Sequence, residues 1–143
     1  MPTYTVTTAN LSLSRQQKSQ IADAITTAHN SQTGAPRFFS QVLFTSLDEG
    51  EHFVGGGVNN APHVYVSGLV REGRSAEIKQ ALMTHVLEAI ARIAGITSEE
   101  VWIYLQDIPA SQMIEFGRFL PALGDEAEWE RGMSPEKRAK LSN

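Results

Sequence analysis

Short runs of β-branched and aromatic residues alternate along this chain with longer segments in which apolar residues recur every three or four positions. The short runs are typical of β-strands and span residues 3–8, 40–46, 63–69 and 101–107. The longer segments carry an apolar stripe, from Ile21 to Ala28 in one and from Ile78 to Ile93 in the other. Such a stripe is typical of a helix with one buried face. The pattern predicts the order strand, helix, strand, twice.

The two halves of the chain are related by a shift of 61 residues, which superposes their structural signals without a gap. Serines suited to cap a helix N-terminus and glycines suited to end a helix coincide under this shift. The coincident pairs are Tyr4 with Tyr65, Ser14 with Ser75, and Gly34 with Gly95. The repeat predicts a duplicated β-α-β unit, with halves at about residues 2–60 and 61–120 and a C-terminal extension at about 121–143.

Two β-α-β units predict an α/β fold in one domain, residues 1–143. A strand joined through a helix to a second strand of the same sheet lies parallel to it, in a right-handed connection. The result is a four-stranded sheet with two helices on one face. Because the other face carries apolar residues without a cover, we expect oligomerisation. We expect the extension, which contains Trp129 and a helix start at Ser134, to wrap a neighbour.

Composition and charge narrow the classes of function. Of the 143 residues, 41% are hydrophobic and 20% are charged, and no run is long enough to span a membrane. We therefore expect a cytoplasmic protein with no membrane partner. A net charge of −4, without a basic tract, disfavours nucleic acid. The chain has no cysteine, and its four histidines lack the spacing of metal ligands, so we expect neither a metal nor a cofactor.

Pro2 is the first candidate for chemistry. If Met1 is removed, Pro2 becomes an N-terminal secondary amine, and an α-amino group titrates near neutrality, so it can act as acid or base. The strand predicted to begin at residue 3 would hold that amine inside the fold. The alternative is that Pro2 merely follows the initiator methionine. With Met1 retained, the nitrogen of Pro2 is an amide and transfers no proton.

Arg71 and Arg74 form the second candidate, in the loop before the second predicted helix. A helix N-terminus presents free N–H groups to an anion. Two arginines beside it can bind a carboxylate through paired hydrogen bonds, and Gly73 lets the backbone approach a ligand closely. The loop predicts a site for a small carboxylate substrate. The alternative is a pair of solvated arginines in a polar loop.

Glu115 and Tyr104 form the third candidate. Tyr104 lies in the fourth predicted strand, on the same face as Trp102, and Glu115 follows that strand among apolar neighbours. A carboxylate in such surroundings is suited to act as a general base, although a helical contact with Arg118, three residues on, explains Glu115 equally well. His29 ends the apolar stripe of the first helix, where a lone histidine more often has a core or capping role than a catalytic one.

Five features together resemble the cis-3-chloroacrylic acid dehalogenase group of the tautomerase superfamily. They are Pro2, His29, and the segments 68–76 (GLVREGRSA), 102–104 (WIY) and 112–121 (QMIEFGRFLP). The likeness covers nearly the whole chain, from Pro2 to about Trp129. It implies the tautomerase fold, a (β-α-β)2 unit that assembles as a homotrimer, and this agrees with the repeat found from the residues.

The resemblance also implies a cofactor-independent reaction. Cis-3-haloacrylates would be hydrated and would then lose halide to yield malonate semialdehyde, which is a hydrolytic dehalogenation. Pro2 would act as the acid toward C2 of the substrate. Arg71 and Arg74 would bind the substrate carboxylate, and His29 would assist in holding it.

By the same resemblance, Glu115, oriented with Tyr104, would activate the water that attacks C3. The dehalogenase has a tyrosine where this chain has Phe116, which removes one hydroxyl near the base. Two other functions stay open. One is keto–enol tautomerisation of a 2-oxo acid such as phenylpyruvate, with Pro2 as the base and no need for Glu115. The other is a non-catalytic protein that acts through its trimer surface.

Overall fold

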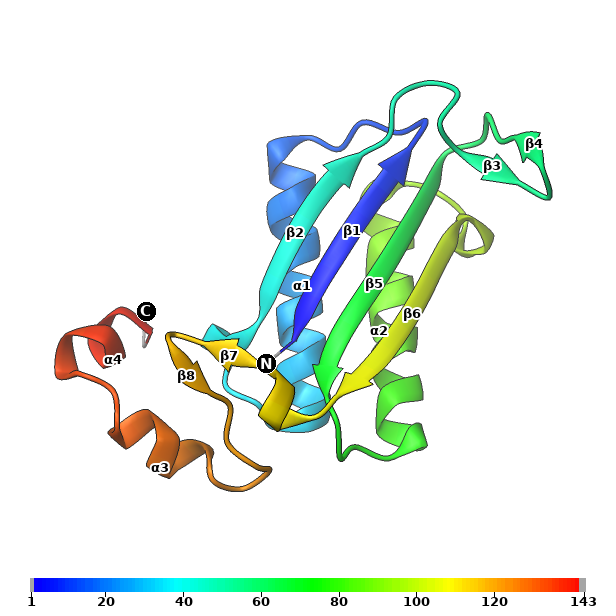
Figure 1. Ribbon diagram of the computed structural model, residues 1–143. Helices are drawn as coiled ribbons and strands as arrows, with labels where there is room; N and C mark the ends of the chain where they lie inside the picture. Colours follow the sequence, from blue (N-terminus) through cyan, green and yellow to red (C-terminus); the bar gives the residue numbers. More distant parts are fainter. Residues whose placement is uncertain (1, 142–143) are drawn as a thin grey trace.

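A four-stranded mixed sheet carries two long helices on one of its faces in the computed structural model of the protein (Figure 1). The structure describes residues 2–141. The strands are β1 (Thr3–Ala9), β2 (Gln41–Ser46), β5 (His63–Arg71) and β6 (Val101–Ile108), in the order β2-β1-β5-β6. β2 lies parallel to β1 and β6 lies parallel to β5, while β1 and β5 pair antiparallel at the centre. The predicted pair of β-α-β units is confirmed.

The two long helices begin and end at the residues that the repeat predicts. α1 (Arg15–Thr33) starts with a capping box, in which the Ser14 hydroxyl accepts from the Gln17 N–H and the Gln17 side chain accepts from the Ser14 N–H. The Ser75 hydroxyl caps α2 (Ala76–Ala94) in the same way. Each helix ends at a glycine in the left-handed region, which favours residues without a Cβ.

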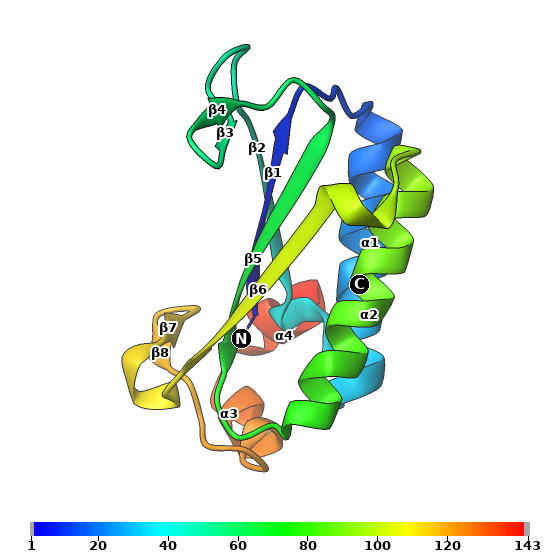
Figure 2. The same cartoon turned by 90° about the vertical axis from the view of Figure 1, so that its right-hand side faces the viewer.

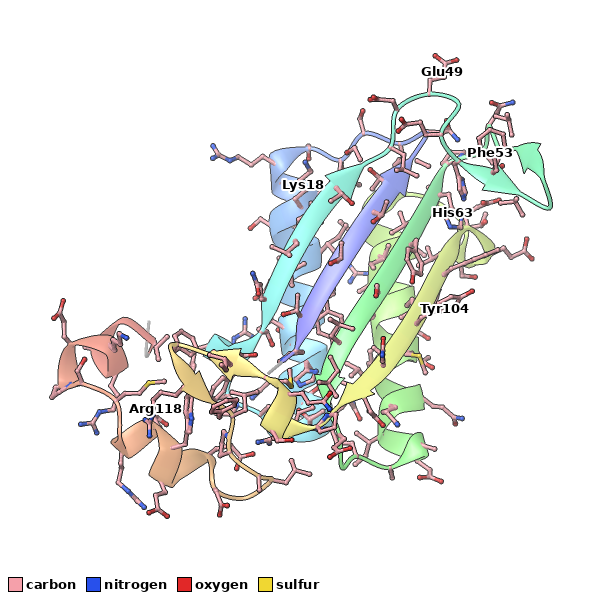
Figure 3. The ribbon with its side chains drawn as sticks, in the orientation of Figure 1. Lys18, Glu49, Phe53, His63, Tyr104 and Arg118 are labelled. Carbon is pink, nitrogen blue, oxygen red and sulfur yellow. The ribbon has the colours of Figure 1, made fainter. Side chains whose placement is uncertain are left out.

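Shorter elements connect and extend this frame. Three 3₁₀ turns precede or follow strands: η1 (Arg37–Phe39), η2 (Ser98–Glu100) and η3 (Ala110–Gln112). Two short hairpins are β3 (Phe53–Val54) with β4 (Gly57–Val58), and β7 (Ile114–Glu115) with β8 (Arg118–Phe119). The chain then forms α3 (Glu126–Arg131) and α4 (Pro135–Leu141). The β3–β4 hairpin, where Figure 3 labels Phe53, lies at the end of the sheet opposite the start of β1 (Figures 1 and 3).

Two apolar clusters hold these elements together. The first fills the space between the sheet and the helices, and its fully buried members include Val6, Ile21, Ile25, Val66, Leu82 and Ile90. The second consists of Phe39, Leu120, Trp129 and Met133, and it packs the C-terminal extension against η1 of the same chain. Trp129 of the extension is buried on its own fold, with its ring 5.3 Å from that of Phe39. Contact of the extension with a neighbour stays a prediction.

The sheet face opposite the helices has no cover within residues 2–141 (Figure 2). It is more polar than the sequence suggested, because β1 presents threonines there, but Leu43, Trp102 and Tyr104 are 44%, 44% and 59% exposed. Large apolar side chains left on a flat face favour association with another molecule. No helix in the described part of the chain is long and apolar enough to cross a membrane.

The sheet is tightly packed around Gly68. A Cβ at this buried position of β5 would lie 2.5 Å from Cδ2 of Leu105 and 2.8 Å from Cε1 of Tyr4. We expect Gly68→Ala to lower the free energy of unfolding by about 1–3 kcal/mol, because the neighbours must move to admit the methyl group. Urea denaturation beside Ser67→Ala measures this, and equal stability of the two variants would contradict the packing described.

Candidate active site

Pro2 lies buried at the start of β1, at the end of the sheet where the β7–β8 hairpin folds over (Figure 1). Its carbonyl oxygen accepts a hydrogen bond of 3.0 Å from the N–H of Gln41, the first residue of β2. Gln41 also lines the cleft that contains Glu115. Pro2 is therefore a neighbour of that cleft. The expected removal of Met1 concerns a residue outside the described part of the chain.

His29 is buried on the face of α1 that packs against the sheet. Its Nδ1 lies 2.8 Å from the hydroxyl of Tyr4, which is also buried. Burial, reinforced by the positive charges of Arg74 and Arg71, lowers the pKa of His29 to about 3. Burial also raises the pKa of Tyr4, so its hydroxyl keeps its proton. A neutral imidazole that accepts from Tyr4 at Nδ1 carries its own proton on Nε2.

Arg71, the last residue of β5, is only 1% exposed. Its Nη1 donates to the carbonyl oxygens of Pro121 and Ala122, at 2.7 and 3.3 Å. Its Nη2 donates to a carboxylate oxygen of Glu126. Both ends of the guanidinium fork are thus held by the C-terminal extension, and the Nε–H is left over.

Arg74 is partly buried and lies three residues after Arg71, in the loop before α2. Its Nη1 donates to the backbone carbonyl oxygen of Arg71 at 2.9 Å. Burial, and then repulsion by the Arg71 charge, lower the pKa of Arg74. The negative charges of Glu126 and Asp107 oppose this lowering in part.

Three buried nitrogens of the predicted site residues have no hydrogen-bond partner within residues 2–141. They are Nε2 of His29, Nε of Arg71 and Nε of Arg74. A buried N–H that lacks a partner is costly, and native proteins retain few of them. The positive charges of Arg71 and Arg74 act on His29, so the three groups share one neighbourhood. Their combined chemistry is that of a receptor for a small anion with several oxygens.

Glu115 lines a cleft of about 350 Å³ between η1 and the β7–β8 hairpin. The walls are apolar and aromatic, and they comprise Phe38, Phe39, Ile114 and Phe116, with Ser40 and Gln41 at the β2 side. The partly buried Glu115 thus borders a space that a small organic molecule can fill. This arrangement fits the predicted role of a base beside an amine.

The hairpin corrects one alternative for Glu115. Glu115 and Arg118 are paired across the β7–β8 hairpin and do not belong to a helix. Phe116 and Gly117 form the turn, with φ of 53° and 77°. Positive φ is strained for a bulky residue such as Phe116. Arg118 turns toward α3, where its Nη1 donates to the carbonyl oxygen of Trp129 at 2.7 Å (Figure 3).

Tyr104 pairs with Ser67 of β5, four residues from Arg71, and so lies away from the two arginines. It lies in the middle of the edge strand β6, 59% exposed on the uncovered face (Figure 3). Its ring packs edge-on against that of Tyr65, 5.4 Å away between centroids. The predicted pairing of Tyr104 with Glu115 therefore does not occur within one chain.

Two residues contribute to the site that the sequence had not marked. Tyr4 holds His29, and its signal was available, because residues two apart on a strand share a face and Tyr4 lies two beyond Pro2. Glu126 holds Arg71, but no local pattern distinguishes it from other acidic residues of the extension. Residues 2–141 contain no group of three or more histidine, cysteine or acidic side chains placed to hold a metal ion.

Comparison with known proteins connects this geometry to a family. The family model described as "Putative oxalocrotonate tautomerase enzyme" matches residues 1–133. The solved structure of N1, a member of the cis-3-chloroacrylic acid dehalogenase family, is similar to this chain with 31% identity and a TM-score of 0.91. The similarity covers 98% of each chain. No curated protein matches this chain.

Two further solved structures share the fold over most of their length. Native Ps01740 is 31% identical, with a TM-score of 0.74, over 79% of this chain and 99% of its own. The symmetric trimer of wild-type fused 4-OT is 24% identical, with a TM-score of 0.76, over 85% of this chain and 98% of its own.

The neutrality of His29 predicts a pH dependence of stability. The unfolded chain takes up a proton on this histidine near pH 6.5, whereas the folded chain does so only near pH 3. Stabilisation is therefore complete above about pH 6.5 and is lost as the pH falls, at up to about 1.4 kcal/mol per pH unit. We expect thermal denaturation to show a steeper loss of stability below pH 6 for the wild type than for His29→Gln. Parallel curves would contradict a buried neutral imidazole.

Proposed function

This chain belongs to the tautomerase superfamily, in its cis-3-chloroacrylic acid dehalogenase group, and we propose that it hydrolytically dehalogenates cis-3-haloacrylates. The products are malonate semialdehyde and halide. The observation that carries the proposal is the set of unpartnered buried nitrogens on His29, Arg71 and Arg74. Such donors match the oxygens of a substrate carboxylate better than any group within the described chain.

The arginines serve the reaction as well as binding. When water adds to C3 of the conjugated acid, negative charge moves onto the carboxylate, which becomes enediolate-like. Arg71 and Arg74, preorganised in a site of low solvent access, stabilise that charge without further reorganisation. His29, neutral, donates from Nε2 and adds a hydrogen bond without adding charge repulsion.

Pro2 acts as the acid in this scheme. Once Met1 is removed, its secondary amine is held by the start of β1 and by the hydrogen bond from Gln41. Protonated Pro2 delivers a proton to C2 of the alkene while the base acts at C3. The two groups act at different carbons, so neither has to move during the addition.

Glu115 acts as the base. Its carboxylate takes a proton from water in the cleft, and the hydroxide oxygen bonds to C3 while Pro2 protonates C2. The resulting 3-halo-3-hydroxypropanoate then loses halide from C3 and a proton from its hydroxyl, leaving the aldehyde of malonate semialdehyde. Water supplies the aldehyde oxygen, one proton is taken up at C2, and no electrons are exchanged with an external partner.

We infer a homotrimer as the working form. The uncovered sheet face carries Leu43, Trp102 and Tyr104 in exposed positions, and the fused 4-OT of similar fold is a trimer. Since Tyr104 does not reach Glu115 in its own chain, it would act on the Glu115 of a neighbouring copy. A site completed between copies would make activity depend on assembly.

A second candidate is keto–enol tautomerisation of a 2-oxo acid such as phenylpyruvate, with Pro2 as an unprotonated base. The family description names a tautomerase, and the carboxylate receptor suits a 2-oxo acid equally. Glu115 lines the same cleft as Gln41, whose N–H binds the Pro2 carbonyl oxygen, and this supports hydration, because tautomerisation needs no second base.

The direct test is proton NMR of the protein with cis-3-chloroacrylate, after mass measurement has confirmed the loss of Met1. We expect malonate semialdehyde at a rate that saturates with substrate. Pro2→Ala should lower kcat by about a hundredfold or more, since acid catalysis of this kind contributes that much. Thr3→Ala, beside it on β1, is the matched control. Unchanged turnover in Pro2→Ala would remove the central role of the amine.

Glu115→Gln separates the two chemistries. The amide cannot take a proton from water, so hydration of cis-3-chloroacrylate should fall by about a hundredfold or more. Phenylpyruvate tautomerisation, followed by ultraviolet absorbance, should remain measurable because it relies on Pro2. An equal loss of both activities would show that Glu115 has a structural role.

A further inference from the structure

We propose that Glu126 is a positioning residue that orients the guanidinium of Arg71 so that its Nε–H faces the substrate carboxylate. The inference rests on the proposed function, because it concerns the same carboxylate receptor. Glu126 lies at the first position of α3, fifty-five residues from Arg71 along the chain. Its proposed effect on substrate passes through Arg71 alone.

The contacts of Arg71 leave one edge of the guanidinium for a ligand. Nη1 is occupied by two backbone carbonyl oxygens, and Nη2 by Glu126. The Nε–H is buried and has no partner among the described residues. A guanidinium is planar, so holding Nη1 and Nη2 also fixes the direction of Nε–H. Without Glu126, Nη2 would lose this side-chain partner, and the plane could tilt.

Glu126 is itself held firmly. Its Oε2 accepts from the N–H of Gly124 at 2.9 Å, while Oε1 accepts from Arg71. One turn later, the buried Trp129 anchors α3, donating from Nε1 to the carbonyl oxygen of Phe119 at 2.7 Å. Although partial burial opposes ionisation, the hydrogen bond from Arg71 lowers the pKa of Glu126 below its usual value. The carboxylate therefore remains charged at neutral pH.

The same segment also contacts the loop that carries both arginines. Leu123 packs directly on Gly73, which lies between Arg71 and Arg74 and has a φ of +106°. A Cβ at Gly73 would collide with the Leu123 side chain, so glycine is required by both the backbone and the contact. Residues 121–126 thus hold this segment at Gly73, through Leu123, and at Arg71, through Glu126 and two backbone carbonyl oxygens.

An alternative is that Glu126 occupies the place of the substrate carboxylate and blocks the site. The structure favours positioning, because Glu126 binds Nη2 and leaves the Nε–H groups of both arginines open.

Steady-state kinetics with cis-3-chloroacrylate give the first test. We expect Glu126→Ala to raise KM about tenfold, as loss of a charge-assisted hydrogen bond implies, with a smaller change in kcat. Glu126→Gln retains an acceptor oxygen and should recover part of the loss. Glu128→Gln, an exposed residue of the same helix, should behave as the wild type. A fall in KM or a gain in kcat/KM for Glu126→Ala would indicate blocking and overturn the proposal.

A double-mutant cycle distinguishes positioning from a general loss of structure. Arg71→Met removes the guanidinium at similar volume, and in that background Glu126→Ala should change kcat/KM by less than about twofold. An effect as large as in the wild-type background would mean that Glu126 acts by another route, and the proposal would fail.

Arginine-selective ¹H–¹⁵N NMR gives a readout that needs no turnover. On titration with propionate, the Nε–H resonance of Arg71 should shift in the wild type and in Glu128→Gln. Glu126→Ala should need about tenfold more propionate for the same shift. Equal propionate affinity, or no shift in the wild type, would overturn the role of Glu126 even if dehalogenation is observed. The expected shifts without any dehalogenation would refute only the proposed reaction.

Discussion

The burial of Arg71 at the end of β5 is the constraint on which the packing of the C-terminal extension depends. A charged guanidinium inside a protein is unfavourable unless its donors are paired. In this chain the partners come from the extension that follows β8: two carbonyl oxygens and the carboxylate of Glu126. The hydrogen bonds of this one side chain thus connect β5 to residues 121–126, which lie about fifty residues further along the chain. The apolar cluster around Trp129 adds further contacts between the extension and the rest of the fold.

The same end of the sheet concentrates donors and excludes water. Alternation along β1 puts Tyr4 on the buried face, where its hydroxyl meets Nδ1 of His29 from α1, and burial keeps that imidazole neutral. Arg74 lies beside it with a further unpartnered Nε–H. Buried N–H groups without hydrogen bonds lower the stability of the fold. Such groups are expected at a binding site, where a ligand accepts their hydrogen bonds. The nitrogens of His29, Arg71 and Arg74 that lower the stability of the fold are thus the same atoms that we propose bind the substrate.

In the proposed mechanism, the groups around the amine of Pro2 decide which reaction that amine supports. An N-terminal proline can act as an acid or a base according to its protonation. The chemistry is then decided by whether a second base and a water lie across the substrate. Glu115 lines a cleft with aromatic walls, and the proposed hydration assigns it the role of that second base. In the proposed trimer, the exposed Tyr104 would act on the Glu115 of a neighbouring copy.

The sequence by itself determined the elements of this fold and most of the residue types in its site. Local patterns depend on residues within about four positions of each other, so they can be predicted from the sequence. These patterns are the strand and helix periodicity, the Ser14 and Ser75 caps and the terminal glycines. The 61-residue repeat then predicted the sheet and its parallel pairs. Only the tertiary structure decided which side chains meet. The contacts of Tyr4 with His29 and of Arg71 with Glu126 span 25 and 55 residues, and the two-residue strands of the β7–β8 hairpin are too short to show a period. The separation of Tyr104 from Glu115 likewise follows from how the sheet and the hairpin pack, because long-range contacts are set by the burial of the whole chain and leave no local signal.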